Sequence, residues 1–224
     1  MPAEPMSTRE RLIEGARHLF WERGYGAASL ADILTRAHAN SGSFYYFFDS
    51  KEALLRAVLE TYLDGLEPVV MGPARRAADD PIDRIFAVLA GYRARLLDTH
   101  CTYGCPLGRL ALEVDAENRP TQDLIAQNFA AWRDAIRGFL DEAGDRLPPD
   151  LDREGLATLV LTVMEGGVMQ ARAAGSPELF DRSVAQLRDY FGRLLAPASG
   201  HAPRTKTAVK ATTRRPVPQR RRKP

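Results

Sequence analysis

The feature that most restricts how this chain can fold is a run of three short helical segments in its first fifty residues. Ser7 and Glu10 match a capping box, in which each side chain satisfies a free amide at the start of a helix. A second helix is expected to begin at Ser29, and Asn40 is a good N-cap for a third, with a tight turn at 38–39 between them. This spacing is what a helix-turn-helix requires, and it predicts one at residues 29–49.

The rest of the chain, up to about residue 195, also has helical patterning. We find no run of alternating β-branched and aromatic residues bounded by turn dipeptides, so no strand is predicted. The fold class is therefore all-α, with an N-terminal three-helix head, a C-terminal helical domain and about nine helices in total. The later helices are expected at about 51–68, 81–98, 106–114, 122–143, 150–174 and 177–195.

The third short helix is chemically suited to lie in the major groove of DNA, as the last helix of such a motif does. Its first residues are small, so the backbone can approach DNA closely, and its free amides form an anion site for phosphate. A lysine in the first turn of the following helix is unfavourable for the helix dipole, and a phosphate partner would explain it. The residues concerned are Ser41, Gly42, Ser43, Tyr45, Tyr46 and Lys51.

Five consecutive aromatic residues occupy positions 44–48, and they could instead be ordinary core. Aromatics in a row point all around a helix, so some must face solvent, and exposed aromatics beside hydroxyls and a lysine are typical of a contact surface. We expect Phe44 and Phe48 to lie on the opposite face and lock the helix onto the first two. For any single residue in the run, core and contact remain comparable interpretations.

Two segments of the head closely resemble the DNA-binding domain of the TetR family: SLADILTRA at 29–37 and NSGSFYYFFDSKEALL at 40–55. The resemblance covers about residues 7–60. It implies a homodimer, a palindromic double-stranded DNA operator, and repression relieved by a small-molecule effector. It also implies DNA contacts from Ser29, Ser41, Ser43, Tyr45, Tyr46 and Lys51. His38 stands where the family usually has the turn glycine, and Ser41 where many members carry a basic or amide residue, so specificity would lean on shape or water.

Two later segments, GCPLGRLALE at 104–113 and MEGGVMQAR at 164–172, resemble one subgroup of this family. In the family, the C-terminal domain binds ligand, and its last two helices pair across a two-fold axis into a four-helix bundle. Gly166 and Gly167 would allow close approach of helices there. An intramolecular core is an equally good interpretation of each apolar residue in these two helices, although two such helices at the chain end favour a dimer.

The effector pocket is expected among the middle helices, with an apolar and aromatic lining that suits a hydrophobic or aromatic effector. Most of these positions could equally belong to the packed core, and the sequence does not distinguish residues that line the pocket from residues that fill the core. The candidates are Phe86, Leu89, Tyr92, Arg93, Leu96, Tyr103, Cys105, Leu110, Phe129 and Trp132.

Cys105 has a second possible role, because some members of this subgroup sense electrophiles or oxidants through a cysteine at the matching place. Its position at a helix start favours a lowered thiol pKa, and Cys101 could resolve a sulfenic acid as a disulfide. Buried cysteines often merely pack, and we favour that inert interpretation. A metal site including His100 lacks a fourth ligand and a zinc-finger spacing, so no metal is predicted.

No enzyme motif is present, so neither catalytic residues nor a cofactor are predicted. The rival hypothesis is a thiol-redox stress protein that uses Cys101 and Cys105. With no long apolar run, no export signal and only two cysteines, we expect a cytoplasmic protein without a membrane partner.

Charge is distributed unevenly along the chain. Residues 201–224 contain nine Lys and Arg and no acid, whereas the other 200 residues carry 22 bases against 29 acids. This tail could add non-specific phosphate affinity, which we favour, or be a neutral solubilising extension, and a purely architectural nucleic-acid binder is a third hypothesis. The predicted domains are a DNA-binding head at 5–65, a regulatory ligand-binding and dimerisation domain at 66–196, and a disordered basic tail at 197–224.

Overall fold

The computed structural model describes residues 5–196, so the predicted basic tail lies outside the described residues. All regular structure within this range is helical, which confirms the all-α prediction. The helices are α1 (Thr8–Arg23), α2 (Leu30–Arg36), α3 (Ser41–Phe47), α4 (Lys51–Gly65), α5 (Gly72–Ala77), α6 (Pro81–Asp98), α7 (Pro106–Glu113), α8 (Arg119–Glu142), α9 (Arg153–Ala174) and α10 (Glu178–Leu195).

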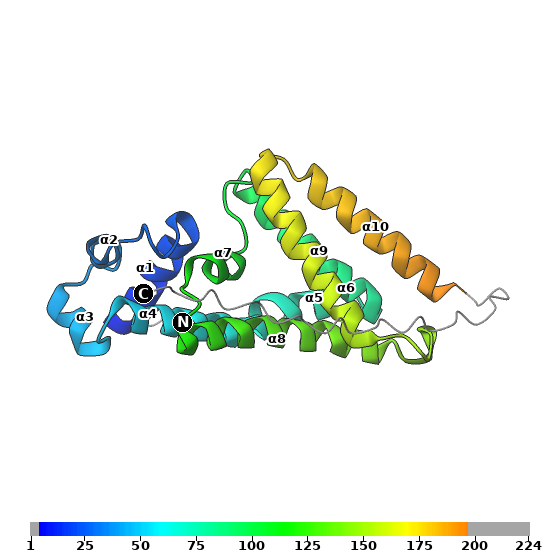
Figure 1. Ribbon diagram of the computed structural model, residues 1–224, viewed down its shortest axis with the longest axis horizontal. Coiled ribbons are helices and arrows are strands. Elements are labelled where there is room, and N and C mark those ends of the chain that lie inside the picture. Colours follow the sequence, from blue (N-terminus) through cyan, green and yellow to red (C-terminus); the bar gives the residue numbers. More distant parts are fainter. Residues whose placement is uncertain (1–4, 197–224) are drawn as a thin grey trace, which may run out of the picture.

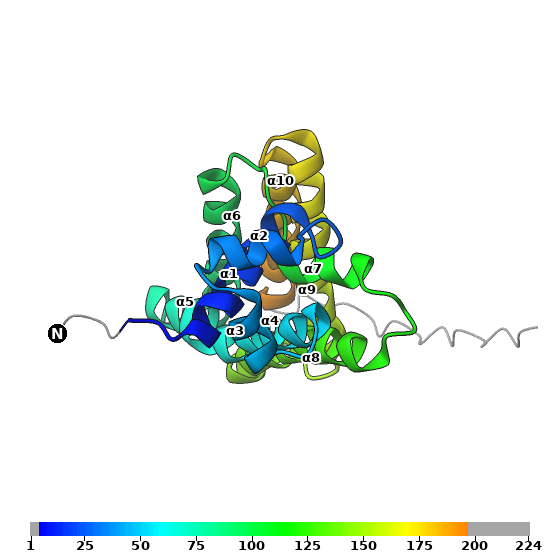
Figure 2. The ribbon, with the colours of Figure 1, turned by 90° about the vertical axis from the view of Figure 1, so that its left-hand side faces the viewer.

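The helices are arranged along one long axis. Helices α1–α3 form a head at one end, α8 runs along the length of the molecule, and α9 and α10 cross above it at the other end (Figure 1). The short helix α7 lies between the head and α9. Figure 2 looks onto the head end, where α1–α3 lie in front of the remaining helices.

The head is held together by a small apolar core. Phe44 from α3 is completely buried, and Phe48, the C-cap of α3, is 5% exposed, as the sequence predicted. They complete a buried core with Leu12, Phe20 and Ile33 from α1 and α2. This packing fixes α3 on the other two helices and leaves its opposite face free.

The turn between α2 and α3 is a Schellman motif. The amide of His38 donates to the carbonyl of Thr35 at 3.2 Å, and that of Ala39 donates to Leu34 at 3.0 Å. His38 has φ of 48°, the left-handed conformation that usually favours glycine, so the turn does tolerate a side chain there. Asn40 then caps α3 by accepting a hydrogen bond from the amide of Ser43 at 2.8 Å.

Helices α4 and α8 join the head to the body. The side chain of Asn128, 1% exposed on α8, donates to the carbonyl of Leu59 on α4 at 3.1 Å. Helix α4 does not stop near Pro68 as expected. It continues through a π-helical segment, Leu66–Met71, into the short helix α5, which the sequence did not predict. A π-helical turn accommodates a proline because it alters the hydrogen-bond pattern that Pro68 cannot complete.

Helices α9 and α10 pack closely within the chain at Gly167. A Cβ atom built there would lie 2.9 Å from Cδ2 of Phe180 and 3.4 Å from its Cα. The neighbouring Gly166 has no such neighbour within 4 Å among the described residues. Of the two glycines that the sequence singled out, only Gly167 therefore serves a close approach inside the protomer.

These two glycines provide a matched test of the packing. We expect Gly166→Ala to raise the free energy of unfolding by about 0.5–1 kcal/mol, because alanine is the better helix former. Gly167→Ala gains the same helix propensity but must push the Phe180 ring and backbone away, so its net effect should be destabilising by about 1–2 kcal/mol. Urea denaturation of both variants measures the difference, and equal stabilisation would show that α9 and α10 are not in contact at Gly167.

Candidate DNA-binding surface and effector cavity

The outward face of α3 carries a group of exposed aromatic side chains. Tyr46 is 82% exposed, Tyr45 59% and Phe47 38%, although residues of this size are usually buried. The rings of Tyr46 and Phe47 meet edge to face, with centroids 4.8 Å apart. Ser41 and Gly42, at the start of α3, are also exposed, and Ser43 is partly buried. The face therefore offers phenol and serine hydroxyls from a helix whose other side is locked in the core.

Two of the predicted DNA contacts also have partners inside the protein. Ser29 is exposed, and its side chain caps α2 in a reciprocal capping box with Asp32. Lys51 donates from Nζ to the carbonyl of Tyr25 at 2.6 Å and lies 4.4 Å from the centre of the Tyr25 ring. Burial lowers the pKa of Lys51, and the nearby Glu113 partly opposes this. The helix-dipole argument for a phosphate partner is weakened, because the lysine already has a carbonyl partner.

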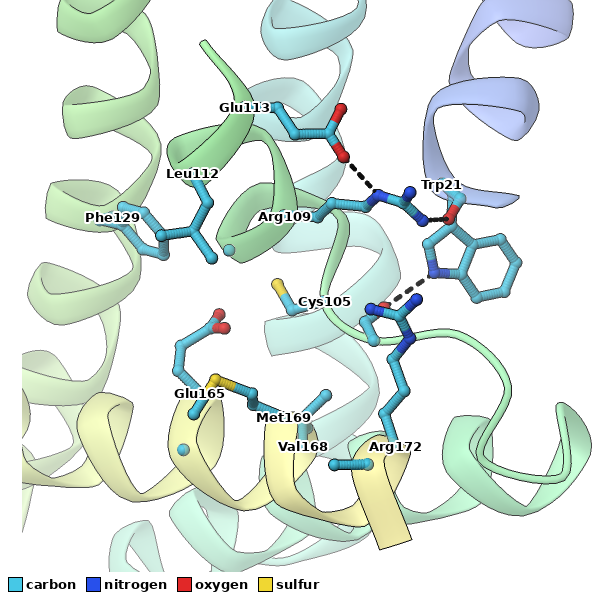
Figure 3. Close-up of a pocket in the computed structure, with 14 residues that line it drawn as sticks. Trp21, Cys105, Arg109, Leu112, Glu113, Phe129, Glu165, Val168, Met169 and Arg172 are labelled. Carbon is cyan, nitrogen blue, oxygen red and sulfur yellow. Dashed lines mark hydrogen bonds and ion pairs between the residues drawn. The ribbon is translucent and has the colours of Figure 1, made fainter. Parts of the chain in front are cut away.

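A large cavity lies between α7, α8, α9 and the end of α1. Its volume is about 780 Å³, within the range of small-molecule sites. Figure 3 shows Cys105, Glu165 and Met169 around it, with Phe129 and Leu112 on one side and Trp21 on the other. We call it the effector cavity because it is a candidate site for a small-molecule effector. Its lining residues are Trp21, Gly104, Cys105, Gly108, Arg109, Leu112, Glu113, Phe129, Glu165, Gly166, Val168, Met169, Arg172 and Ala173.

Of the ten pocket residues predicted from the sequence, only Cys105 and Phe129 line the effector cavity. Tyr92, Leu96 and Tyr103 line a second, smaller cavity next to α1. The other five lie elsewhere: the structure buries Phe86, Leu89, Leu110 and Trp132 in the packed core, and it exposes Arg93.

Two of these five residues have contacts that direct them away from both cavities. Phe86 packs against Phe191 of α10, with ring centroids 5.5 Å apart. Arg93 forms a bidentate ion pair with Asp181, with N···O distances of 2.7 and 2.9 Å. The residues filling the core and those lining a pocket have the same apolar composition, so periodicity did not separate them.

Sequence reasoning missed several lining residues that come from outside the middle helices. Trp21 belongs to α1. Arg109, Glu165, Met169 and Arg172 are polar or flexible side chains, which are not expected in a pocket predicted to be aromatic. These four residues lie in the segments 104–113 and 164–172, which the sequence had marked as motifs and which form the facing helices α7 and α9. The two motifs were therefore the signal that could have identified these residues as pocket lining.

Helix α7 contacts the C-terminal end of α1 through Arg109. Its guanidinium donates to the carbonyls of Glu22 at 3.3 Å and Arg23 at 2.5 Å, which are free because they lie at the helix end. Nε of the same guanidinium donates to Glu113 at 2.7 Å, and Glu113 accepts from the amide of Gly26 at 3.2 Å. The indole of Trp21 donates to Gly104 just before α7 (Figure 3). We call Arg109 and Glu113, with these contacts, the α7 clamp.

Gly24 is required beneath the α7 clamp for two reasons. Its φ of 90° is a conformation that residues with side chains rarely adopt. A Cβ atom there would also lie only 2.2 Å from Oε1 of Glu113 and 2.6 Å from Nη2 of Arg109. Burial raises the pKa of Glu113, but hydrogen bonds from Arg109 and Gly26 outweigh it, so the net pKa is lowered. Glu113 is therefore charged at neutral pH and pairs with Arg109.

Cys105 faces Glu165 across the effector cavity (Figure 3). Burial raises the pKa of the thiol well above its ordinary value, and the charge of Glu165 raises it further. The amides of Leu107 and Gly108 at the start of α7 lower it, as the sequence argument expected, but they are outweighed. Burial also raises the pKa of Glu165, and the neighbouring thiol of Cys105 partly opposes this. The lowering at the helix start is therefore outweighed, first by burial and then by Glu165, which agrees with the favoured interpretation of Cys105 as a packed thiol.

Within residues 5–196, no three His, Cys, Asp or Glu side chains come together as a metal site would require. None of the described helices is both long enough and apolar enough to cross a membrane.

An exposed helix-turn-helix fused to a helical body with a large cavity defines the class of DNA-binding regulators. Comparison with known proteins then identifies the family. Residues 12–58 match the family described as bacterial regulatory proteins, tetR family, and residues 81–187 match the tetracyclin repressor-like C-terminal domain. This chain belongs to the TetR family of helix-turn-helix transcriptional regulators.

Individual relatives are regulators of the same family. The transcriptional repressor NemR of Escherichia coli is 31% identical over 191 residues, covering 81% of this chain and 92% of NemR. The repressor DhaR of a Mycobacterium species is 25% identical over 176 residues, covering 78% of this chain and 87% of DhaR. The fold is shared with a TetR regulatory protein from Rhodobacter sphaeroides, with a TM-score of 0.75 at 20% identity, covering 82% and 98% of the two chains. The reduced form of NemR gives a TM-score of 0.71 at 23% identity, covering 82% and 96%.

The α7 clamp can be tested by hydrogen exchange. We expect Arg109→Gln to free the last carbonyls of α1, so that amides at 20–26 exchange about tenfold faster. Arg119→Gln is the matched control, because Arg119 is exposed and pairs only with Asp123 one turn away on the same helix. Unchanged protection at 20–26 in Arg109→Gln would show that the clamp does not hold the head.

The reactivity of Cys105 gives a second test, best made in a Cys101→Ser background. The midpoint of its pH–rate profile for alkylation by iodoacetamide should lie above the ordinary cysteine pKa, because burial and Glu165 both disfavour the thiolate. Glu165→Gln removes the facing charge, so the midpoint should shift to lower pH and the rate at pH 8 should rise. The midpoint reports the pKa independently of access, and a midpoint at or below the ordinary value would contradict this assignment.

Proposed function

We propose that this protein is a homodimeric repressor that binds a palindromic operator through α3 and is released by a small molecule in the effector cavity. The observation that carries the proposal is the pair of phenol side chains, Tyr45 and Tyr46, projecting from a helix whose opposite face is locked in the core. Such side chains can reach phosphates and base edges when the helix enters the major groove. The proposed DNA contacts are Ser29, Ser41, Gly42, Ser43, Tyr45, Tyr46 and Lys51.

The dimer is supported by apolar side chains left exposed on the last two helices. Leu159 and Met169 on α9 are 41% and 63% exposed, and Leu179 and Tyr190 on α10 are 38% and 42% exposed. A second copy would cover such residues by a two-fold pairing of these helices. The proposed domains are a DNA-binding head at 5–65 and a regulatory and dimerisation domain at 66–196.

The effector is proposed to be a hydrophobic or aromatic molecule, because Phe129, Leu112, Val168 and Met169 give the cavity an apolar lining. An effector wedged between α7 and α9 would displace α7, and the α7 clamp would carry that displacement to the end of α1. The clamp therefore offers a direct link between the cavity and the head. Release then requires that the effector bind the displaced state more tightly than the operator-binding state.

An electrophilic effector is a second candidate, because the thiol of Cys105 lines the cavity and the solved NemR structure is described as a reduced form. Both segments of the subgroup resemblance support it, since they form α7 and the part of α9 that face each other across Cys105 and Glu165. The raised thiol pKa opposes rapid reaction in the resting state. Such an effector would need to bind before it reacts.

The operator contact is tested by Tyr46→Ala in a gel-shift titration with the DNA upstream of the protein's own gene. We expect operator affinity to fall about tenfold or more, without loss of stability because this side chain is 82% exposed. Leu97→Ala is the control, since it truncates a side chain 44% exposed on α6, outside the head. A footprint should show two protected half-sites about one DNA turn apart. Equal binding by Tyr46→Ala and the unaltered protein, or one half-site only, would refute the proposal.

A further inference from the structure

A second cavity lies on the other side of Trp21 from the effector cavity. Its volume is about 360 Å³, enough for one small aromatic molecule, and it is enclosed by α1, α4, α6 and the segment 99–106. The two cavities share Trp21, Gly104 and Val168 as a common wall. The indole of Trp21 closes this wall by donating to the Gly104 carbonyl at 2.8 Å. We call the smaller space the α1 cavity.

Aromatic rings form much of the lining of the α1 cavity. Tyr103 packs on Trp21 with ring centroids 4.9 Å apart, and Tyr92 and Tyr62 contribute from α6 and α4. Burial raises the pKa of Tyr62 and Tyr92, so both phenols stay neutral at physiological pH. These side chains suit the flat face of a single aromatic ring.

Two arginines occupy one side of the same cavity. Arg17 lines it from α1 and Arg95 from α6, with the imidazole of His18 and one lining acid, Asp98. Glu14 lies behind them and accepts from Nε and Nη2 of Arg17 at 2.8 and 2.6 Å. Among the described residues, Nη1 of Arg17 makes no hydrogen bond, and Arg95 has no ion pair. Two arginines with donors to spare therefore border an aromatic space.

The hydroxyl of Tyr62 is a further unused group at this place. Its oxygen is buried and makes no well-aligned hydrogen bond among the described residues, although the guanidinium of Arg17 lies beside it. Burial raises the pKa of this phenol, and the adjacent guanidinium opposes the rise. A buried hydroxyl without a partner is unfavourable, and an acceptor on a ligand would remove that penalty.

We propose that the α1 cavity is a second ligand site, selective for a small aromatic carboxylate. The ring would pack among Trp21, Tyr92 and Tyr103, and the carboxylate would accept hydrogen bonds from Nη1 of Arg17 and, after a small shift, from Tyr62. This site lies on the other side of Trp21 from the effector cavity, and its anionic ligand differs in chemistry from the apolar effector proposed there. It does not depend on DNA binding.

Calorimetric titration with benzoate tests this site, with benzylamine and benzyl alcohol as cationic and neutral probes of the same ring size. We expect benzoate to bind the unaltered protein with a Kd on the order of 1 mM or below, and about tenfold more tightly than either control ligand. Arg17→Gln should weaken benzoate about tenfold and leave benzyl alcohol unchanged. That ligand dependence separates recognition from a general loss of structure. Tyr62→Phe should weaken benzoate several-fold without lowering stability.

Two blocking variants distinguish the cavities. Val69 lines only the smaller of the two and is 55% exposed, so Val69→Trp should fill it and abolish benzoate binding. Leu112 lines only the effector cavity and is 84% exposed, so Leu112→Trp should leave benzoate binding intact. No heat of binding at millimolar benzoate, equal affinity for benzylamine, or loss in Leu112→Trp with retention in Val69→Trp would each overturn the proposal. If Val69→Trp does not fold, the Arg17→Gln comparison decides.

Discussion

The interaction on which the arrangement of this protein depends is the α7 clamp, the contact of the Arg109 guanidinium with the exposed carbonyl end of α1. A helix end carries unsatisfied carbonyls and partial negative charge, and a cation there both completes the hydrogen bonds and complements the dipole. Because Arg109 is also paired with Glu113, its position is fixed by α7 rather than by solvent. The head and the body thus meet through a polar, directional contact in addition to the apolar packing of α4 on α8.

This contact places a short helix beside both cavities and against the end of α1. Helix α7 and its N-cap supply Cys105, Gly108 and Leu112 to the effector cavity and Pro106 to the α1 cavity. Close packing requires a glycine at position 108, because a Cβ atom there would lie 2.5 Å from a carboxylate oxygen of Glu165. Whatever enters either cavity therefore contacts α7 or the segment leading into it, and α7 is bonded to α1.

The head was predictable because its signals are local. Ser7, Ser29 and Asn40 are N-caps as expected, and the aromatic run divides into buried Phe44 and Phe48 and exposed Tyr45 and Tyr46. The cavities were less predictable, because their walls combine residues far apart in the chain. Trp21 and Glu165 lie 144 positions apart and meet only through the packing of α1, α7 and α9. The pKa of Cys105 could not be predicted for the same reason, because the helix start is visible locally, whereas the burial of the thiol and the facing carboxylate are not.

Gly24, Arg109 and Glu113 limit how freely the parts of this regulator can be exchanged. A hybrid that carries this head on the body of another relative would leave the end of α1 without its partners, or set a foreign side chain against Gly24. Engineers who recombine such proteins should therefore transfer 104–113 together with the head. For the same reason, substitutions at positions 24, 109 and 113 should be inherited together rather than one at a time.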